Sequence, residues 1–388
     1  MTFVQTRRGA GRVPAAVILT ALAVTLGSCS SSGPAKSAPP GSRAGSAPAG
    51  SKTGSAGTTA GRRSAASPPG TQPGSDPSVL PGPVLIADEG NDRLVEVDPN
   101  GKVIWEFPRP GDLQPGETFK VPDDAFFTPD GKQIIATQEE DYTLSLIDVA
   151  THHIVWRYGV SGEHGYGPNK LWNPDDALVL PDGSVLTADI KHCRLLLIPK
   201  GAHAPSRIFG KSTTVCKHAP PARFGSPNGA FPMANGHYLV TEINGDWVDE
   251  MDLKGKIYLT THPPGVRYPS DTNEVGPDRY LTVDFSTPGA IETFDHRGRL
   301  LWQYKPTGAD ALNKPSLAEP LANGDVIATD DHNHRVIVVD PRTNKIVWQY
   351  GVLGRPGRTA GLLDGPDGLD LAPPHSLLVR HAATMGTP

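Results

Sequence analysis

One segment of the sequence recurs along the chain, and its repetition limits the folds that the chain can adopt. Its clearest copy, residues 172–189 (WNPDDALVLPDGSVLTAD), has an apolar run, a Pro-Asp-Gly turn and a second apolar run that ends at Asp189. This pattern predicts two short β-strands joined by a tight turn. A single hairpin cannot bury its own apolar face, so repeated hairpins predict stacked units that share a core.

Six copies of the segment can be aligned by their openings, which are 42 to 53 residues apart. The openings are Pro122-Asp123-Asp124, Pro174-Asp175-Asp176, Pro227-Asn228-Gly229, Pro269-Ser270-Asp271, Pro315-Ser316-Leu317 and Pro366-Asp367-Gly368. The second predicted strands end at Asp88, Gln138, Asp189, Glu242, Asp284 and Asp330. A third strand follows each of them, and the fourth carries an aromatic residue: Trp105, Trp156, Phe209, Tyr258, Trp302 and Trp348. Four strands per repeat at this period are typical of a β-propeller blade.

We therefore predict an all-β chain that folds as a six-bladed β-propeller of four-stranded blades. From Val84 onward no long segment has helical periodicity. The first repeat lacks an opening strand, whereas residues 366–371 form an opening strand without a third or fourth strand after it. The simplest closure of the ring lets this C-terminal strand complete the first blade, which removes an exposed sheet edge.

The first 80 residues differ in composition from the predicted propeller, residues 81–388. Residues 1–28 contain three arginines and an apolar run that is short for a membrane span, which predicts an export signal. Residues 26–29, Leu-Gly-Ser-Cys, resemble the lipobox of bacterial lipoproteins, which implies a lipid on Cys29. The alternative is an ordinary cleaved signal with a chance cysteine. Residues 29–80 are almost wholly Ser, Gly, Ala, Pro and Thr, which predicts a disordered tether.

The lipobox resemblance implies that the protein is exported and held by lipid on Cys29 at the outer side of the bacterial cytoplasmic membrane, or elsewhere in the cell envelope. Residues 81–388 carry a formal charge of −12, because the first 80 residues contribute +7 to the total of −5. An acidic body argues against nucleic acid as a partner, since phosphate backbones require the opposite sign. We expect a monomer.

Several stretches resemble known propeller repeats. Residues 87–98 (ADEGNDRLVEVD) and 328–340 (ATDDHNHRVIVVD) resemble the NHL repeat. Three other segments resemble the PQQ-like repeat: DVATHHIVWRYG, DHRGRLLWQYK and DPRTNKIVWQYG, which begin at residues 148, 295 and 340. Both repeats imply a propeller and no particular activity. A PQQ-like repeat does not itself supply a cofactor site, so we do not expect pyrroloquinoline quinone.

Residues 154–189 are similar to the arylsulfotransferase-like propellers, in which catalytic histidines line the central channel. These propellers place a His-Asp pair where this chain has Pro174-Asp175-Asp176, and no other opening supplies a histidine. The resemblance therefore implies a propeller with catalytic relatives, but without the histidine that sulfuryl transfer would need.

Propeller topology places the long connections between blades, the openings and the ends of the second strands on one face, where we expect ligands to bind. A ring of carboxylates and an amide there suits Ca²⁺, which takes six to eight oxygen ligands. The alternative is that each Asp accepts hydrogen bonds from its own loop. The histidines of this face are candidate general bases or metal ligands, and its arginines are candidate anion clamps. The candidate residues are Asp124, Asp176, Asn228, Asp271, Asp367, His164, His192, Arg194, His332 and Arg335.

Two cysteines remain if Cys29 is lipidated, and in an exported protein they predict a disulfide between Cys193 and Cys216. This bond would hold the loop of residues 210–226 over the channel mouth. The alternative is a pair of free, buried thiols.

The sequence contains no nucleophile elbow, zinc-protease motif, phosphate loop or dinucleotide fingerprint. We therefore predict a binding or scaffold module whose loop-rich face recognises a small molecule, a glycan or a protein. The alternative is an enzyme at the channel mouth, either a metal-assisted hydrolase or lyase or a sulfotransferase-like transferase. A metal site or an enzyme would be favoured if three or more of five side chains converge within ligand distance of one point: Asp124, Asp176, Asn228, Asp271 and Asp367.

Overall fold

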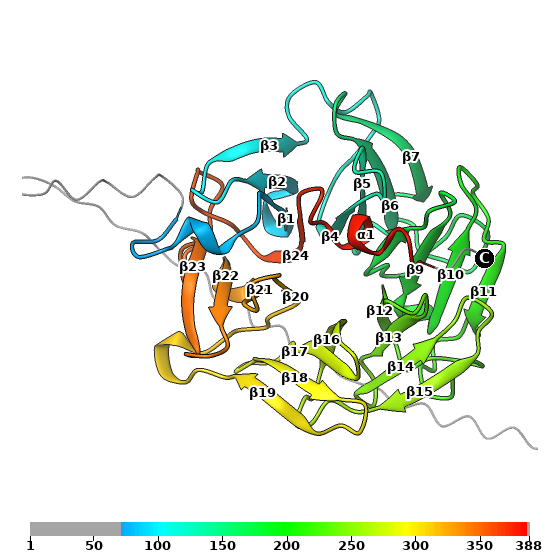
Figure 1. Cartoon of the computed structure of the whole chain (residues 1–388). Helices are drawn as coiled ribbons and strands as arrows, with labels where there is room; N and C mark the ends of the chain where they lie inside the picture. The colour runs from blue at the N-terminus through cyan, green and yellow to red at the C-terminus, as the bar shows by residue number, and fades with distance from the viewer. Residues whose placement is uncertain (1–70, 386–388) are drawn as a thin grey trace, which may run out of the picture. The chain divides into compact units, whose positions relative to one another are not determined.

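The computed structural model describes residues 71–385, which form a β-propeller of six four-stranded antiparallel sheets arranged in a ring (Figure 1). This confirms the predicted fold class. The predicted signal peptide, Cys29 and the predicted tether up to residue 70 lie outside the described residues. No helix within residues 71–385 is long and apolar enough to cross a membrane.

Each blade runs outward from a first strand at the channel to a fourth strand at the rim. Blade 1 consists of β24 (Pro366–Leu371), β1 (Val84–Asp88), β2 (Arg93–Val97) and β3 (Val103–Phe107). Blade 2 consists of β4 (Pro122–Phe127), β5 (Gln133–Gln138), β6 (Thr143–Asp148) and β7 (His153–Gly159). Blade 3 consists of β8 (Ala177–Val179), β9 (Val185–Asp189), β10 (Arg194–Ile198) and β11 (Arg207–Gly210).

The other three blades repeat this plan. Blade 4 consists of β12 (Pro227–Pro232), β13 (Tyr238–Glu242), β14 (Trp247–Met251) and β15 (Ile257–Thr261). Blade 5 consists of β16 (Pro269–Gly276), β17 (Arg279–Asp284), β18 (Ala290–Asp295) and β19 (Leu300–Tyr304). Blade 6 consists of β20 (Ala318–Pro320), β21 (Val326–Asp330), β22 (Arg335–Asp340) and β23 (Lys345–Gly351). The short helices are η1 (Pro77–Val79), η2 (Glu89–Asn91), η3 (Ile190–His192), η4 (Gly308–Asp310), η5 (Asp331–Asn333) and α1 (Leu377–His381).

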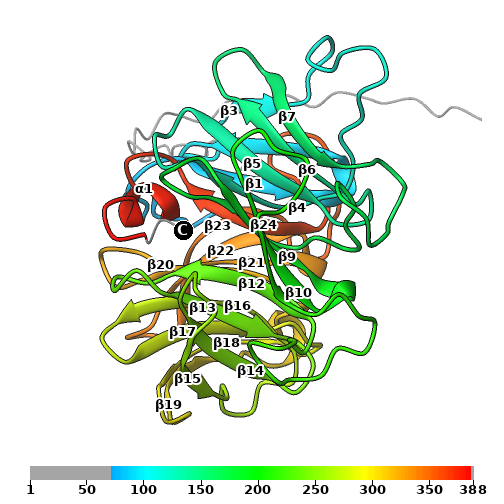
Figure 2. The ribbon, with the colours of Figure 1, turned by 90° about the vertical axis from the view of Figure 1, so that its right-hand side faces the viewer.

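The ring closes as predicted, because the C-terminal strand β24 is the innermost strand of blade 1. It pairs antiparallel with β1, with Val84 opposite Leu371 and Asp88 opposite Pro366. The short helix α1 follows β24 and lies on the face of the ring opposite to the openings (Figure 2). Its first residue, Leu377, donates a backbone hydrogen bond of 2.9 Å to Asp370. Closure therefore leaves β1 with no free edge.

The tryptophans of the fourth strands explain why an aromatic residue recurs there. In four blades the indole N–H donates a hydrogen bond to the turn between the third and fourth strands of the next blade. The pairs are Trp105 with Val149 O at 3.1 Å, Trp156 with Ala202 O at 3.2 Å, Trp302 with Asn344 Oδ1 at 2.7 Å, and Trp348 with Pro99 O at 2.8 Å. Each tryptophan thus joins its blade to the next through both apolar packing and a specific hydrogen bond.

The end of the predicted tether is more ordered than its composition suggests. Residues 71–79 lie against β23, where Thr71 forms a β-bridge with Tyr350 and Asp76 N donates to Val347 O at 2.9 Å. Residues 71–79 are therefore part of the folded unit, because backbone hydrogen bonds to the rim of blade 6 replace the side-chain burial that these residues lack.

Candidate functional site

The openings of the first strands bring two tiers of polar side chains into the central channel. The second residue of each opening forms the outer tier: Asp123, Asp175, Asn228, Ser270, Ser316 and Asp367. The third residues form the inner tier, to which only blades 2, 3 and 5 contribute an acid: Asp124, Asp176 and Asp271. All nine side chains are buried.

Two consecutive residues can both reach the channel because the strand pairing is irregular at the openings. The register between the first and second strands shifts after Pro122, Pro227 and Pro269. Such a bulge breaks the alternation of side chains between the two faces of a sheet. The glycines at two of the other inner-tier positions are also required, because a Cβ on Gly229 would overlap Asp176 and one on Gly368 would overlap Asp124.

The outer tier is linked by hydrogen bonds around part of the ring. Asn228 Nδ2 donates to Ser270 Oγ at 3.0 Å, and Ser316 Oγ donates to Asp367 Oδ2 at 3.1 Å. The hydroxyls of Ser270 and Ser316 are 3.4 Å apart. These contacts fix the side chains of blades 4, 5, 6 and 1. In blades 2 and 3, the carboxyls of Asp123 and Asp175 lie close enough to share a proton.

The inner-tier carboxylates converge on one another. Oxygen atoms of Asp124, Asp176 and Asp271 lie within 4.8 Å of one another. Both oxygens of Asp176, Oδ1 of Asp124 and Oδ2 of Asp271 are buried and accept no hydrogen bond from a nitrogen or hydroxyl group in residues 71–385. The carboxyls of Asp176 and Asp271 lie close enough to share a proton. Asp271 Oδ1 accepts a hydrogen bond of 3.4 Å from Asn228 of the neighbouring blade. Asp176 therefore does not cap its own loop, in contrast to the alternative that the sequence left open.

Burial raises the pKa of every carboxyl in the two tiers, and the neighbouring carboxylates add to the effect. The pKa of Asp271 rises to about 7 and that of Asp367 to about 6. Burial and the other acids raise the pKa values of the remaining four carboxyls well above their ordinary range. Without a cation in the channel, these groups must therefore hold several protons at neutral pH.

The outer tier opens into a cavity of about 160 Å³ at the channel mouth. Three acids that line this cavity were not predicted from the sequence. Glu89, Glu139 and Asp331 line it, and each directly follows the last residue of a second strand. That regular position is the sequence signal that could have identified them. Burial and nearby acids raise the pKa of Glu89 to about 8 and that of Asp331 to about 9.

The five predicted channel residues all lie in the channel, but in two tiers and not in one ring. Asp124, Asp176 and Asp271 belong to the inner tier, and Asn228 and Asp367 to the outer tier. The difference arises because our alignment combined second and third positions of the openings. It also omitted Asp123 and Asp175, which the structure places beside Asp124.

Three predicted residues of the loop-rich face are instead buried beside acids at the ends of second strands, the two arginines in ion pairs. The Nε atoms of Arg194 and Arg335 donate to Asp189 and Asp330, each at 2.7 Å. His192 is fully buried, with Nδ1 2.8 Å from Asp189 Oδ2. These residues are therefore not exposed anion clamps or an exposed base.

The same arrangement in blade 1 explains why acids recur at the ends of the second strands. Asp88 binds Arg93 at 2.6 Å and also accepts a hydrogen bond from the backbone N–H of Asp364 at 2.7 Å. The acid thus ties the loop between two blades to the arginine that begins the third strand.

The remaining two predicted histidines are exposed. His332 lines the mouth cavity and lies 3.5 Å from Asp331. His164 stacks on Trp172 with ring centroids 4.3 Å apart and does not line the cavity. The predicted disulfide between Cys193 and Cys216 is present.

Comparison with known proteins agrees with the fold and leaves the function open. Residues 229–364, about a third of the chain, match the family described as outer membrane protein assembly factor BamB, which has PQQ-like repeats. No curated protein matches the chain. A protein of unknown function from Bacteroides caccae is 16% identical, with a TM-score of 0.51 over 74% of this chain and 98% of that one.

Two further similar structures are weaker matches. A virginiamycin B lyase from Staphylococcus aureus is 14% identical, with a TM-score of 0.47 over 72% of this chain and 86% of that one. A chain of a nidogen/laminin complex is 15% identical, with a TM-score of 0.49 over 75% of this chain and 98% of that one. At 16% identity, the likeness to the Bacteroides caccae protein shows a shared fold alone, and the two weaker matches carry no argument.

Proposed function

We propose that the propeller is a ligand-binding module whose central channel holds a divalent cation, with calcium as the expected ion. The observation that carries the proposal is the convergence of three buried carboxylates of the inner tier, several of whose oxygens accept no hydrogen bond from a nitrogen or hydroxyl group in residues 71–385. None of the ion pairs within this part of the chain involves a carboxyl of either tier. Buried carboxylates without a cationic side chain are balanced either by protons or by a metal.

The carboxylate oxygens lie close enough together for several of them to bind one calcium ion. Calcium–oxygen distances of about 2.3–2.6 Å put opposite ligands about 4.6–5.2 Å apart. The oxygens of Asp124, Asp176 and Asp271 lie within 4.8 Å of one another, and those of Asp123 and Asp175 lie equally close to Asp124. Five carboxylates around one stretch of the channel could supply most of the six to eight oxygens that calcium takes.

The cation would also present coordination positions toward the mouth cavity. A ligand that offers hydroxyl or carboxylate oxygens could occupy them, and Tyr268 and Phe285 provide an aromatic wall beside these positions. This combination favours a glycan or a small oxygen-rich molecule over a flat protein surface. The lipobox resemblance at Cys29 supports an anchor in the cell envelope, from which the tether would extend the propeller as a monomer.

Metal analysis and thermal unfolding of the full chain test the proposal. After treatment with a chelator, calcium at about 100 times its dissociation constant should add about 2.7 kcal/mol to the free energy of unfolding and raise the melting temperature by several degrees. Asp176→Asn should abolish this shift. Asp182→Asn, which alters an exposed turn after the same first strand, should preserve it. The proposal fails if calcium causes no shift in the unaltered chain, or if Asp176→Asn responds to calcium as the unaltered chain does.

The sequence-based alternative, a metal-assisted hydrolase or lyase at the channel mouth, is a second candidate. Carboxyls with raised pKa values at a cavity are typical of general acids and bases, and Glu89 and Asp331 have this property. Glu89→Gln should then abolish turnover of ester, lactone or polysaccharide substrates while the calcium shift remains. A sulfotransferase-like activity gains no support, because neither tier contains a histidine.

A further inference from the structure

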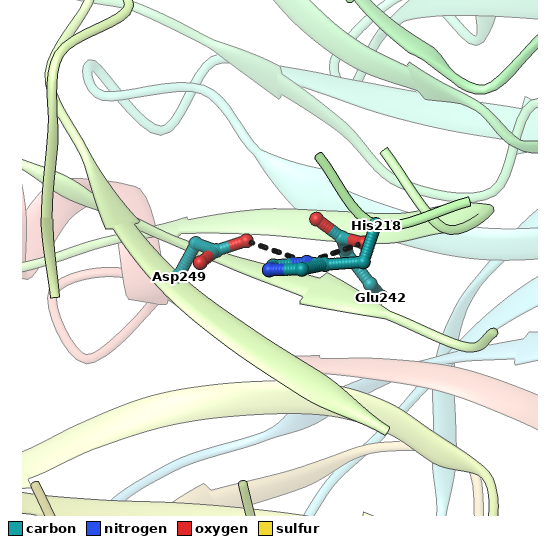
Figure 3. Close-up of side chains that lie close together, drawn as sticks. All are labelled: His218, Glu242 and Asp249. Carbon is teal, nitrogen blue, oxygen red and sulfur yellow. Dashed lines mark hydrogen bonds and ion pairs between the residues drawn. The ribbon is translucent and has the colours of Figure 1, made fainter. Parts of the chain in front are cut away.

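Blade 4 carries a second cluster of metal-ligating side chains, away from the channel tiers. Figure 3 shows the imidazole of His218 between the carboxylates of Glu242 and Asp249. His218 belongs to the loop of residues 210–226, Glu242 ends β13 and Asp249 is the middle residue of β14. The Nδ1 atom of His218 is 3.1 Å from Glu242 Oε2 and 3.7 Å from Asp249 Oδ2.

This blade departs from the ion-pair pattern of blades 1, 3 and 6. There the acid at the end of the second strand binds the arginine that begins the third strand. In blade 4 the residue opposite Glu242 is Trp247, which carries no charge. Glu242 therefore lacks the usual cation, and a second acid, Asp249, is buried beside it. Two buried carboxyls in contact require a proton or a cation between them.

Each of the two acids has one oxygen held by the protein and one left without a hydrogen bond. Gly225 N donates to Glu242 Oε2, and Thr260 Oγ1 donates to Asp249 Oδ1 at 2.5 Å. Glu242 Oε1 and Asp249 Oδ2 are buried and have no hydrogen-bond partner in residues 71–385. Both side chains are 0% exposed. The donors orient the carboxylates while leaving oxygens free to bind an ion.

Besides the contact of its Nδ1 atom with Glu242, His218 is held in place by contacts that do not use its ring nitrogens. Its ring stacks on that of Trp247 with centroids 4.2 Å apart. Two residues earlier in the same loop, Cys216 forms the disulfide with Cys193 of blade 3. The side chain is 20% exposed, so one side of the cluster reaches solvent.

We propose that His218, Glu242 and Asp249 bind one zinc ion, or a related first-row transition ion, and that a fourth position stays open to water or an external ligand. Zinc binds nitrogen and oxygen at about 2.0–2.2 Å, so neighbouring ligand atoms of a tetrahedral site are about 3.3–3.6 Å apart. The distances from His218 Nδ1, 3.1 Å to Glu242 Oε2 and 3.7 Å to Asp249 Oδ2, lie on either side of this range. Glu242 Oε2 also accepts the hydrogen bond from Gly225, so the second oxygen of this carboxylate, Oε1, is the one without a hydrogen bond. An imidazole ligand favours a transition ion over calcium, which distinguishes this site from the oxygen-only channel.

Cobalt titration of the full chain tests the site. The titration is done in saturating calcium, so that calcium fills the oxygen-only positions of the channel and cobalt does not bind there. The unaltered chain should bind one equivalent of Co²⁺ with visible absorption bands of a low-symmetry site, and Zn²⁺ should remove these bands. His218→Ala should weaken binding by at least about 100-fold, since it removes the only nitrogen ligand. His237→Ala is the matched control, because His237 contacts Glu250 of the same blade at 2.5 Å without belonging to the cluster.

The result that supports the proposal is loss of the bands in His218→Ala and their retention in His237→Ala, with both variants folded by circular dichroism. Because His218 lies in a partly exposed loop, its removal should leave the blade intact. The proposal is overturned if the unaltered chain shows no bands, in which case a shared proton balances the two carboxyls. It is also overturned if His218→Ala binds cobalt as tightly as the unaltered chain.

Discussion

Removal of calcium should make the stability of the propeller depend on pH, because the buried carboxyls of the channel then depend on protons. Burial raises the pKa of Asp271 to about 7 and that of Asp367 to about 6, whereas an unfolded Asp titrates near 3.9. Above pH 4 the native state therefore holds more protons than the unfolded state. The free energy of unfolding is highest below about pH 4 and falls as the pH rises through 6 and 7.

The size of the effect follows from the two pKa values. As the pH rises from 5 to 8, Asp271 destabilises the native state over about two pH units, up to its pKa of about 7. Asp367 does so over about one unit, up to its pKa of about 6. At 1.36 kcal/mol per unit, these two carboxyls alone should lower the free energy of unfolding by about 4 kcal/mol. The other four carboxyls change it in the same direction, because burial raises their pKa values as well.

Urea denaturation followed by tryptophan fluorescence measures this change at pH 5 and pH 8, with EDTA or with saturating calcium. We expect the fall in EDTA, and a much smaller one in calcium. Asp271→Asn should reduce the fall in EDTA by about 3 kcal/mol, because the two pH units that Asp271 contributes are then lost. Asp182→Asn should behave as the unaltered chain. Equal stability at the two pH values in EDTA, or an unchanged pH dependence in Asp271→Asn, would refute the reasoning.

Three further predictions concern the scaffold. Arg335→Met should lower the free energy of unfolding in urea by about 3–5 kcal/mol, because it leaves Asp330 buried without its partner; an unchanged value would contradict a charged pair. Replacing both Cys193 and Cys216 by serine should cost about 3 kcal/mol, the closure entropy of a loop of 23 residues, and a reductant should then have no further effect on the unfolding midpoint. Deletion of residues 366–388 should leave β1 with a free edge and give aggregates in size-exclusion chromatography, whereas a monodisperse product with native circular dichroism would show that closure is dispensable.

The blades could be predicted because their signals are local and repeat. Trp105, Trp156 and Trp348 recur at the same place in their blades, and each donates to the same turn of the next blade. The ion pairs were also within reach of the sequence, since an arginine follows Asp88, Asp189 and Asp330 by five residues each time. We instead treated two of these arginines as free groups of the loop-rich face.

The two tiers could not be predicted in the same way, because side-chain direction at the openings depends on bulges in the strand pairing. Whether Asp123 or Asp124 lies in a given tier is decided by that local irregularity, and no turn or periodicity signal marks it. The cluster of blade 4 depends on contacts between distant segments. His218 reaches Glu242 and Asp249 from a loop that is positioned by a disulfide to another blade.

The closure of the ring also determines how the propeller would respond to a pulling force. Val84, at the start of β1, is paired with Leu371, at the end of β24, so tension on the two ends would open this pair like a zip, one backbone bond after another. Such unzipping resists little force. The load would first meet the short end segments: residues 71–79 on β23, and α1, whose Arg380 binds Glu319 of blade 6 at 2.7 Å. The resistance to mechanical unfolding thus depends on the contacts of these two end segments and not on the blades themselves.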